Sequence, residues 1–442
     1  MSLLQPHRLA ETCSRVEGTN PIAVYGRVVE VVGLTIEATG PPLRIGEFCY
    51  VQPMDSAERV PAEVVGFGSG RLKLMALGKM EGISPGSLVI PTHKPQNLRV
   101  GHDLLGRVIG SLGQPLDDGP PPVYTAIVPL RRRPPAPLER RRITEPVATG
   151  IRAIDACITF GKGQRMGIMS GSGLGKSKTL GMIARNTNAD VNVLALVGER
   201  GREVREFLEL DLGPEGLERS VVVVATSDEP ALLRIRAAYV ATAIAEWFRD
   251  QGTAVMLLMD SITRFGMAQR EVGLAVGEPP TTKGYPPSVF VLLAQLIERA
   301  GTSARGSITG VYTVLVEADD LNDPIGDAVR SLLDGHVVLD RGLASRNHYP
   351  AVDVLESISR CMIDVASEEH QSLAGRIRTV LATYRDAEDL VNIGAYAPGS
   401  NREIDEALRL MPSLRRFLRQ GLYEHTPYEE IVDKMRLALE GR

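Results

Sequence analysis

A glycine-rich octapeptide, SGSGLGKS at residues 170–177, constrains the fold of this chain more than any other segment. The short apolar run RMGIM precedes it, and the helix-forming stretch KTLGMIARN follows it. Glycines in such a turn let successive backbone N–H groups converge on phosphate oxygens at the start of a helix. The segment therefore predicts a strand, a phosphate-binding loop and a helix, the unit from which parallel α/β sheets are built.

The side chains of this loop suit a nucleoside triphosphate and its metal, so we expect ATP and Mg²⁺ to bind here. Lys176 brings an ammonium group to the β- and γ-phosphates, and the hydroxyl of Ser177 is a Mg²⁺ ligand. Ser170 stands where the pattern usually has glycine or alanine, and it is small enough that we expect binding to survive. The predicted cofactor-binding residues of the loop are Ser172, Gly173, Leu174, Gly175, Lys176, Ser177 and Lys178.

Two carboxylates follow apolar runs that read as strands. Asp260 ends the run AVMLLM and is predicted to hold Mg²⁺ beside the phosphate loop. Glu199 comes just after the run VNVLALV. Its position supports two interpretations: a carboxylate that positions the attacking water, or a surface ion pair with Arg200 or Arg202.

The alternation of patterns divides the chain into parts and predicts an α/β protein with a mostly parallel sheet. Residues 96–146 are rich in proline and arginine; we interpret them as a solvated extended linker rather than a surface for RNA or acidic lipid. The predicted parts are an N-terminal segment (1–20), a small β-barrel (21–95), the linker (96–146), the nucleotide-binding core (147–367) and a C-terminal helical domain (368–442), in which Ser400–Glu403 predicts a capping box.

Composition argues against several classes of function. The net charge of -4, one Trp and eight Phe give little support for nucleic-acid binding, so no nucleic-acid partner is expected. The four cysteines have no CxxC pair, which argues against a disulfide framework or a zinc site. No apolar run approaches the roughly 18 residues of a membrane span, and no signal peptide is evident. We therefore expect a soluble, cytoplasmic protein.

Four longer segments stand out: VGERGREVREF, TSDEPALLRIRAAYVATAIAEWFRDQG, LLMDSITRFGMAQREVG and PAVDVLESISR. They resemble a known family, the hexameric ATPases related to the rotary ATP synthase α and β subunits. The resemblance extends from about residue 22 to the C-terminus, and it is strongest to the ATPases of type III protein export, flagellar or injectisome. It implies a RecA-like core between a β-barrel and a helical domain.

The resemblance also implies roles that spacing alone does not supply. Glu199 aligns with the catalytic carboxylate, and Arg200 and Arg264 align with arginines near the phosphates. Tyr349 aligns with an aromatic residue that packs on adenine. Arg360 aligns with an arginine finger that reaches into the neighbouring subunit's site. The catalytic set is therefore expected to be Lys176, Glu199, Arg200, Arg264 and Arg360.

Such a protein is expected to hydrolyse ATP as a homohexamer and to energise protein export by releasing chaperones and unfolding substrates. The resemblance implies a stator or regulator at the N-terminal segment and chaperone–substrate complexes at the C-terminal domain. It also implies a central stalk, an export gate and a cytoplasmic location with peripheral membrane association only, at the inner face of the membrane export apparatus. A flagellar system is favoured slightly over an injectisome.

Three alternatives stay open from the sequence. A catalytic subunit of a rotary ATP synthase is disfavoured, because GRIRTVLATYRDAEDLV stands where an acidic segment would be expected. A Rho-like RNA translocase is disfavoured because the first 95 residues hold only two Phe and two Tyr. A non-catalytic ring member that binds nucleotide without hydrolysing it is disfavoured by Glu199 and Arg360, although Ser170 keeps it in play.

Overall fold

The computed structural model describes residues 24–93, 96–316 and 323–441. The predicted N-terminal segment, residues 1–20, lies outside the described residues. Contacts divide the chain into two compact units, Met1–Gln96 and Asn97–Arg442.

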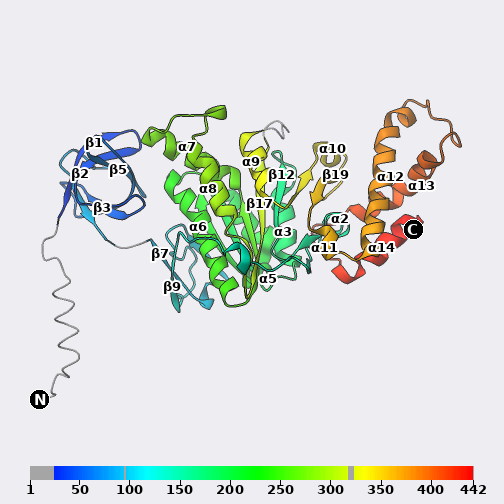
Figure 1. Ribbon diagram of the computed structural model, residues 1–442, viewed down its shortest axis with the longest axis horizontal. Coiled ribbons are helices and arrows are strands. Elements are labelled where there is room, and N and C mark those ends of the chain that lie inside the picture. Colours follow the sequence, from blue (N-terminus) through cyan, green and yellow to red (C-terminus); the bar gives the residue numbers. More distant parts are fainter. Residues whose placement is uncertain (1–23, 94–95, 317–322, 442) are drawn as a thin grey trace, which may run out of the picture. The chain divides into compact units, whose positions relative to one another are not determined.

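The described part of the first unit is a closed barrel, which confirms the predicted fold of this region (Figure 1). The strands follow one another around it in the order β1-β2-β5-β4-β3-β6, and β1 pairs with β6 to close it. Buried Cys49 and Val51 flank exposed Tyr50, the period of two that lets a strand fill the interior and face solvent. The strands are β1 (Gly26–Val32), β2 (Thr35–Thr39), β3 (Phe48–Gln52), β4 (Val60–Gly68), β5 (Arg71–Ala76) and β6 (Leu88–Pro91).

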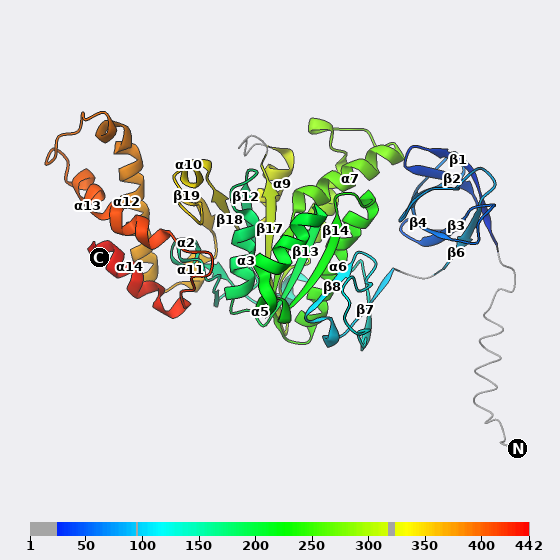
Figure 2. The same ribbon diagram turned by 180° about the vertical axis from the view of Figure 1, so that it is seen from behind.

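The second unit is built on a mostly parallel sheet in the order β19-β18-β12-β17-β15-β13-β14-β8, with β16 paired to β17. Its buried apolar strands and the helices on both of its faces are the predicted architecture (Figures 1 and 2). The strands are β8 (Arg107–Gly110), β12 (Arg165–Ser170), β13 (Val191–Glu199), β14 (Ser220–Thr226), β15 (Ala254–Asp260), β16 (Gly301–Thr302), β17 (Ser307–Leu315), β18 (Gly335–Leu339) and β19 (Val352–Ser359).

Helices connect these strands and cover the sheet; α6, for example, packs on β13, β14 and β15. The segment after Glu199 contains a π-helical stretch, η3, between two short α-helices. The helices of this part of the chain are α2 (Arg152–Cys157), α3 (Lys176–Asn186), α4 (Gly201–Glu206), η3 (Phe207–Leu212), α5 (Gly213–Glu218), α6 (Ala231–Asp250), α7 (Ile262–Val276), η4 (Thr282–Gly284), α8 (Pro287–Ile297), α9 (Pro324–Leu332), α10 (Arg341–Ser345) and, after the last strand, α11 (Met362–Val365).

The predicted solvated linker is wrong for much of residues 96–146. β8 pairs in parallel with β14 and so extends the main sheet. A small ribbon pairs β7 (Asn97–Val100) with β9 (Ala126–Pro129), and the region also holds the short elements η1 (His102–Leu104) and η2 (Pro137–Glu139). At its end begins β10 (Pro146–Val147), which pairs with β11 (Phe160–Gly161) further along the chain. Backbone pairing between distant segments overrides the extended character that the prolines favour.

Several arginines of the two clusters in this region contact the core, although they remain partly exposed. Arg132 forms an ion pair with Asp250, and Arg131 lies over the ring of Tyr239. Arg140 donates to the carbonyl of Ala300 at 2.9 Å. These guanidinium groups therefore fasten the connecting segment to the nucleotide-binding core.

The C-terminal region is helical, as predicted, and shares a hydrophobic core with the sheet domain. Its elements are α12 (Glu368–Asn392), α13 (Arg402–Leu418), η6 (Tyr428–Glu430) and α14 (Ile431–Glu440). The predicted capping box is displaced by one residue: Asn401, not Ser400, caps α13, accepting from the amides of Glu403 and Ile404. Among the described residues, no helix is both long and apolar enough to span a membrane.

Candidate active site

The glycine-rich loop joins the carboxyl end of β12 to the start of α3, as the sequence predicts. Ser170 is buried at the end of the strand, where its small side chain fits without disturbing the turn. Gly173 and Gly175 have φ of 79° and 87°, a conformation that disfavours residues with a Cβ. Among the described residues, no hydrogen bond of good geometry occupies the backbone N–H groups of residues 172–175, so they remain available to an anion.

Lys176 brings the three strongest sequence signals together. Its Nζ lies 2.5 Å from Asp260 Oδ1 and 3.3 Å from Glu199 Oε1. Burial alone lowers the pKa of Lys176, but the charges of Asp260 and Glu199 outweigh burial and leave that pKa above its ordinary value. The lysine is therefore a fixed positive charge between two carboxylates at the strand ends.

Glu199 is bound by Lys176 and Arg264 rather than by Arg200 or Arg202, so the geometry favours the first of its two interpretations. Arg264 Nε lies 3.3 Å from Glu199 Oε1, and Glu199 itself is only 8% exposed. The N–H at Arg264 Nε is buried and has no hydrogen bond of good geometry among the described residues. This N–H is therefore a buried donor beside the loop cluster whose hydrogen-bonding capacity is unused among the described residues.

Thr313 belongs to this cluster, although no motif in the sequence marks it. Its hydroxyl lies 2.8 Å from Asp260 Oδ1 and 3.3 Å from the carbonyl of Met259. The contact arises because β15 and β17 are adjacent parallel strands. The only feature of the sequence that could have indicated this contact is a polar residue within the apolar run VYTVL.

Tyr349 lies beside the loop. A Cβ placed on Gly175 would be 3.8 Å from Tyr349 Cε1, so the ring is a close neighbour of the loop backbone. Tyr349 is 42% exposed, so part of the residue is open to a stacking partner.

Arg360 lies at the other end of β19 from Tyr349. Val352, at the start of this strand, pairs with Leu339, and Leu339 pairs with Ser170 at the loop. β19 has eight residues, a span of about 25 Å. Arg360 is exposed and follows the far end of β19, at the opposite end of the strands from the loop. It therefore cannot reach the loop of its own chain.

Two other predicted site residues do not join the Lys176 cluster through their side chains. Arg200 is 76% exposed at its side chain and pairs with Glu203 at 3.4 Å. Lys178 binds the buried carboxylate of Asp211 in η3 at 2.7 Å. Any contact of Lys178 with a nucleotide would therefore come from its backbone, not from its ammonium group.

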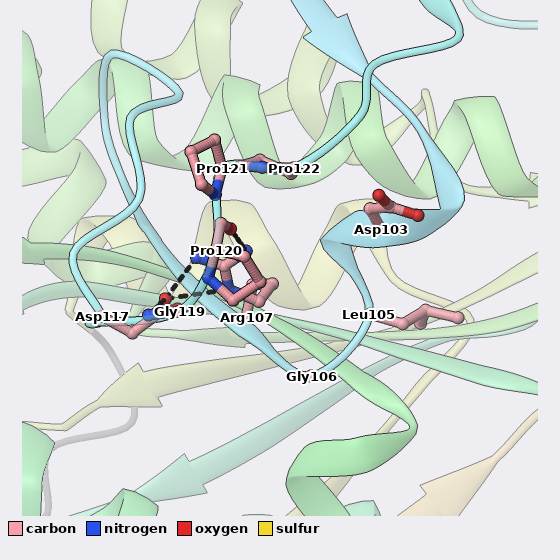
Figure 3. A pocket seen from close by; sticks show the side chains of 9 residues that line it. All are labelled: Asp103, Leu105, Gly106, Arg107, Asp117, Gly119, Pro120, Pro121 and Pro122. Carbon is pink, nitrogen blue, oxygen red and sulfur yellow. Dashed lines mark hydrogen bonds and ion pairs between the residues drawn. The ribbon is translucent and has the colours of Figure 1, made fainter.

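A pocket of about 450 Å³ lies elsewhere, beside β8 (Figure 3). Two of its charged groups satisfy each other: Arg107 binds Asp117 and donates to the carbonyl of Pro120 at 2.6 Å. The third, Asp103, accepts from the amide of Val123 at 3.0 Å. Asp117 also accepts from the amide of Val108 at 2.7 Å. This self-contained network stabilises the proline-rich turn and gives no reason to place a ligand in the pocket.

The residues at the loop fit a magnesium nucleotide. Free amides and the buried N–H of Arg264 offer donors to phosphate oxygens, while Ser177 and Asp260 offer oxygen ligands to a metal. No group of three or more His, Cys, Asp or Glu side chains in the described residues could hold a metal by itself. Mg²⁺ needs no such cage, because the phosphates supply part of its coordination. Fold and site together define a P-loop ATPase.

Comparison with protein families covers both units. Residues 28–93 match the beta-barrel domain of the ATP synthase alpha/beta family, and residues 150–359 match its nucleotide-binding domain. Residues 366–437 match the type III secretion (T3SS) EscN ATPase C-terminal domain.

Individual relatives are similar over almost their full length. The flagellum-specific ATP synthase of Bacillus subtilis is 53% identical, covering 94% of this chain and 95% of that protein. The type 3 secretion system ATPase of Xanthomonas euvesicatoria is 49% identical, covering 92% of each. The structure of the assembled ATPase EscN from enteropathogenic E. coli superposes with a TM-score of 0.89 at 44% identity, covering 94% of this chain and 100% of that one.

The chain belongs to the family of flagellar and type III secretion ATPases. This confirms the resemblance inferred from its sequence and the predicted architecture of barrel, nucleotide-binding core and helical C-terminal region. The relatives do not favour the ATP synthase subunit or the RNA translocase.

Proposed function

We propose that this protein hydrolyses ATP with Mg²⁺ in a ring of six identical copies and that the hydrolysis energises protein export. The observation that carries the proposal is the meeting of Lys176, Asp260 and Glu199 at the glycine-rich loop. These groups supply a phosphate-binding cation, a metal ligand and a carboxylate for water at one edge of the sheet.

In the proposed site, the amides of residues 172–175 and the ammonium of Lys176 bind the β- and γ-phosphates. Ser177 and Asp260 hold Mg²⁺, which neutralises phosphate charge when bound. The Nε–H of Arg264 donates to the γ-phosphate, since it has no acceptor of its own.

Glu199 orients a water molecule for in-line attack on the γ-phosphorus, and the carboxylate accepts the water's proton as the bond to ADP breaks. Its pairing with Arg264 holds the carboxylate in place. Tyr349 packs on the adenine base. When a neighbouring copy covers Arg200, this arginine leaves Glu203 and approaches the phosphates.

The proposed arginine finger, Arg360, explains why a ring is needed. Arg360 and the loop of the same chain lie at opposite ends of the strands. Each copy can therefore use its arginine only to complete a neighbour's site. Identical copies in a head-to-tail ring satisfy this requirement at every interface. EscN has been solved as an assembled ATPase, which supports the same arrangement here.

Partners follow from the family. EscN has been solved in complex with its central stalk EscO, and we propose an equivalent stalk for this chain. Chaperone–substrate complexes would meet the C-terminal helices, a stator or regulator would bind residues 1–20, and the ring would face the export gate from the cytoplasm. A flagellar system is proposed, and it is supported by a flagellum-specific relative at 53% identity.

The test mixes two inactive variants. Lys176→Ala removes the phosphate-binding cation and Arg360→Ala removes the finger, and each alone should lower turnover by at least about 10²-fold. In a mixed ring, some interfaces pair an intact loop from one copy with an intact finger from the next. Mixing should therefore restore measurable ATPase activity. If mixtures stay as inactive as their components while forming rings, the finger does not act between copies.

The Lys176→Ala variant also tests the site as a whole. It should lose ATPase activity and export of substrates in cells. Parental ATPase activity in this variant would rule out the proposed site. Arg360→Ala should still bind nucleotide, because the finger acts on the transferring phosphoryl group rather than on the bound ground state.

A further inference from the structure

Gln420 is a buried glutamine in the loop that follows α13, and every polar atom of its side chain has a partner. It is 6% exposed. Its Nε2 donates to the carbonyls of Gly150 and Glu424, each at 2.7 Å, and its Oε1 accepts from the amide of Arg152 at 2.9 Å. One side chain thus joins the C-terminal helical region to the segment that opens the nucleotide-binding core.

The backbone of the same residue holds the tyrosine that lies beside the phosphate loop. The amide of Gln420 donates to the carbonyl of Tyr349 at 2.9 Å. One residue earlier, Arg419 donates to the carbonyl of Arg346 at 3.0 Å. The segment that carries Tyr349 is therefore fixed by two consecutive residues of the C-terminal region.

Arg152 stabilises this loop through its guanidinium group. Its guanidinium donates to the carbonyl of Phe417 at 2.7 Å, to the carbonyl of Arg419, and to the carboxylate of Glu424. Arg152 is 7% exposed, so these bonds lie largely out of water, where breaking one leaves an unpaired polar group. The loop has little freedom to shift unless the helices to which it belongs shift as well.

We propose that Gln420 is a positioning residue for base recognition, which makes the placement of Tyr349 depend on how the C-terminal helical region sits on the core. The inference rests on the proposed role of Tyr349 at adenine. A partner that moves α12 and α13 would change the affinity for the base through Gln420 and leave the contacts of the loop with phosphate in place. By thermodynamic linkage, bound nucleotide would in turn favour the position of α12 and α13 in which Tyr349 is placed for the base.

Gln420→Glu tests this with little change in size. The carboxylate still accepts from Arg152, but both donors at Nε2 are lost and a negative charge faces two carbonyls. We expect KM for ATP to rise about tenfold with kcat within about twofold of the parent. The inhibition constant of inorganic tripolyphosphate, which has no base, should not change.

A second arm uses Tyr349→Ala. This variant should itself raise KM for ATP, and adding Gln420→Glu to it should raise KM no further, because the tyrosine through which Gln420 acts is gone. Gln371→Glu is the matched control: Gln371 also donates from Nε2 to two carbonyls, at 2.7 and 3.2 Å, but lies away from Tyr349. KM in the control should equal that of the parent.

The outcomes distinguish the positioning role of Gln420 from the adenine contact of Tyr349. An equal rise in KM with and without Tyr349, or a parallel change with tripolyphosphate, overturns the positioning role, because Gln420 then supports the whole site. A normal KM in Tyr349→Ala refutes the adenine contact and with it this inference. Should Gln420→Glu fail to fold, the uncharged Gln420→Met passes through the same measurements.

Discussion

The ammonium of Lys176 lies 2.5 Å from the carboxylate of Asp260, 84 residues further along the chain. Thr313 holds the same carboxylate oxygen, Oδ1, at 2.8 Å. Asp260 is thus held in place before any metal binds. Until then, the ammonium of Lys176 balances the negative charge of its carboxylate. This preorganised carboxylate leads to the first prediction.

Asp260→Asn should weaken metal binding. The amide keeps the shape and the hydrogen bond from Thr313 but has no charge for Mg²⁺. We expect the Mg²⁺ concentration for half-maximal ATPase activity to rise about 10- to 100-fold, with kcat also reduced. A magnesium titration of steady-state hydrolysis measures both. An unchanged midpoint would show that Asp260 does not help to hold the metal.

Glu199→Gln should separate binding from hydrolysis. Its amide occupies the same space beside Lys176 and Arg264 but cannot accept a proton from water. We expect kcat to fall about 10²- to 10⁴-fold while a fluorescent ATP analogue still binds. Glu203→Gln is the control, since Glu203 pairs with the exposed Arg200, and it should hydrolyse ATP within a few-fold of the parent. Equal activities in the two variants would contradict the catalytic role.

Gly198→Ala should damage the site through Arg264. Gly198 has a φ of +72°, and a Cβ there would lie 2.8 Å from Arg264 Cδ. We expect stability to fall by about 1–2 kcal/mol from the backbone alone, and kcat to fall as Arg264 is displaced. Gly394→Ala is the matched control, because Gly394 has a φ of +71° with nothing within 4 Å of a Cβ. It should lose similar stability and keep kcat, as thermal melts and ATPase assays would show.

His348 should make folding sensitive to acid. Burial, then the charges of Arg419 and Arg415, lower its pKa to about 4, from 6.5. A histidine with a lowered pKa stays neutral in the fold, so its contribution is complete above about pH 6.5 and is lost as the pH falls toward 4.

Allowing for screening by solvent, the loss over this window is expected to be about 1–2 kcal/mol. His348→Gln cannot titrate, so its free energy of unfolding should fall less between pH 7 and pH 5 than that of the parent. Urea denaturation at the two pH values measures the difference. If the free energy of unfolding falls equally in parent and variant between these pH values, His348 does not titrate in this range.

The sequence pattern was sufficient for the parts of the site that depend on local chain geometry. The octapeptide at 170–177 and Asp260 were readable because a glycine-rich turn and a carboxylate after an apolar strand need only their near neighbours. The barrel and the alternating core were readable for a similar reason, since burial imposes a period on each strand. The linker was misread, because the pairing of β8 with β14 depends on residues more than a hundred positions apart.

Glu199 shows the limit most clearly. From the sequence it had two interpretations, and its neighbours Arg200 and Arg202 looked like equally good partners. The fold instead places it beside Lys176 and Arg264. Strand order decides this contact, and strand order is not written in any one segment.

The sequence by itself determined that the chain carries a phosphate loop, a sheet to hold it and the family to which it belongs. Only the tertiary structure decided that Thr313 supports Asp260, that Lys178 binds Asp211, and that Gln420 holds Tyr349. Local motifs persist because backbone geometry enforces them over a few residues. Contacts between distant segments form only when packing of the whole core brings them together, because burial and hydrogen bonding there act on neighbours in space rather than in sequence.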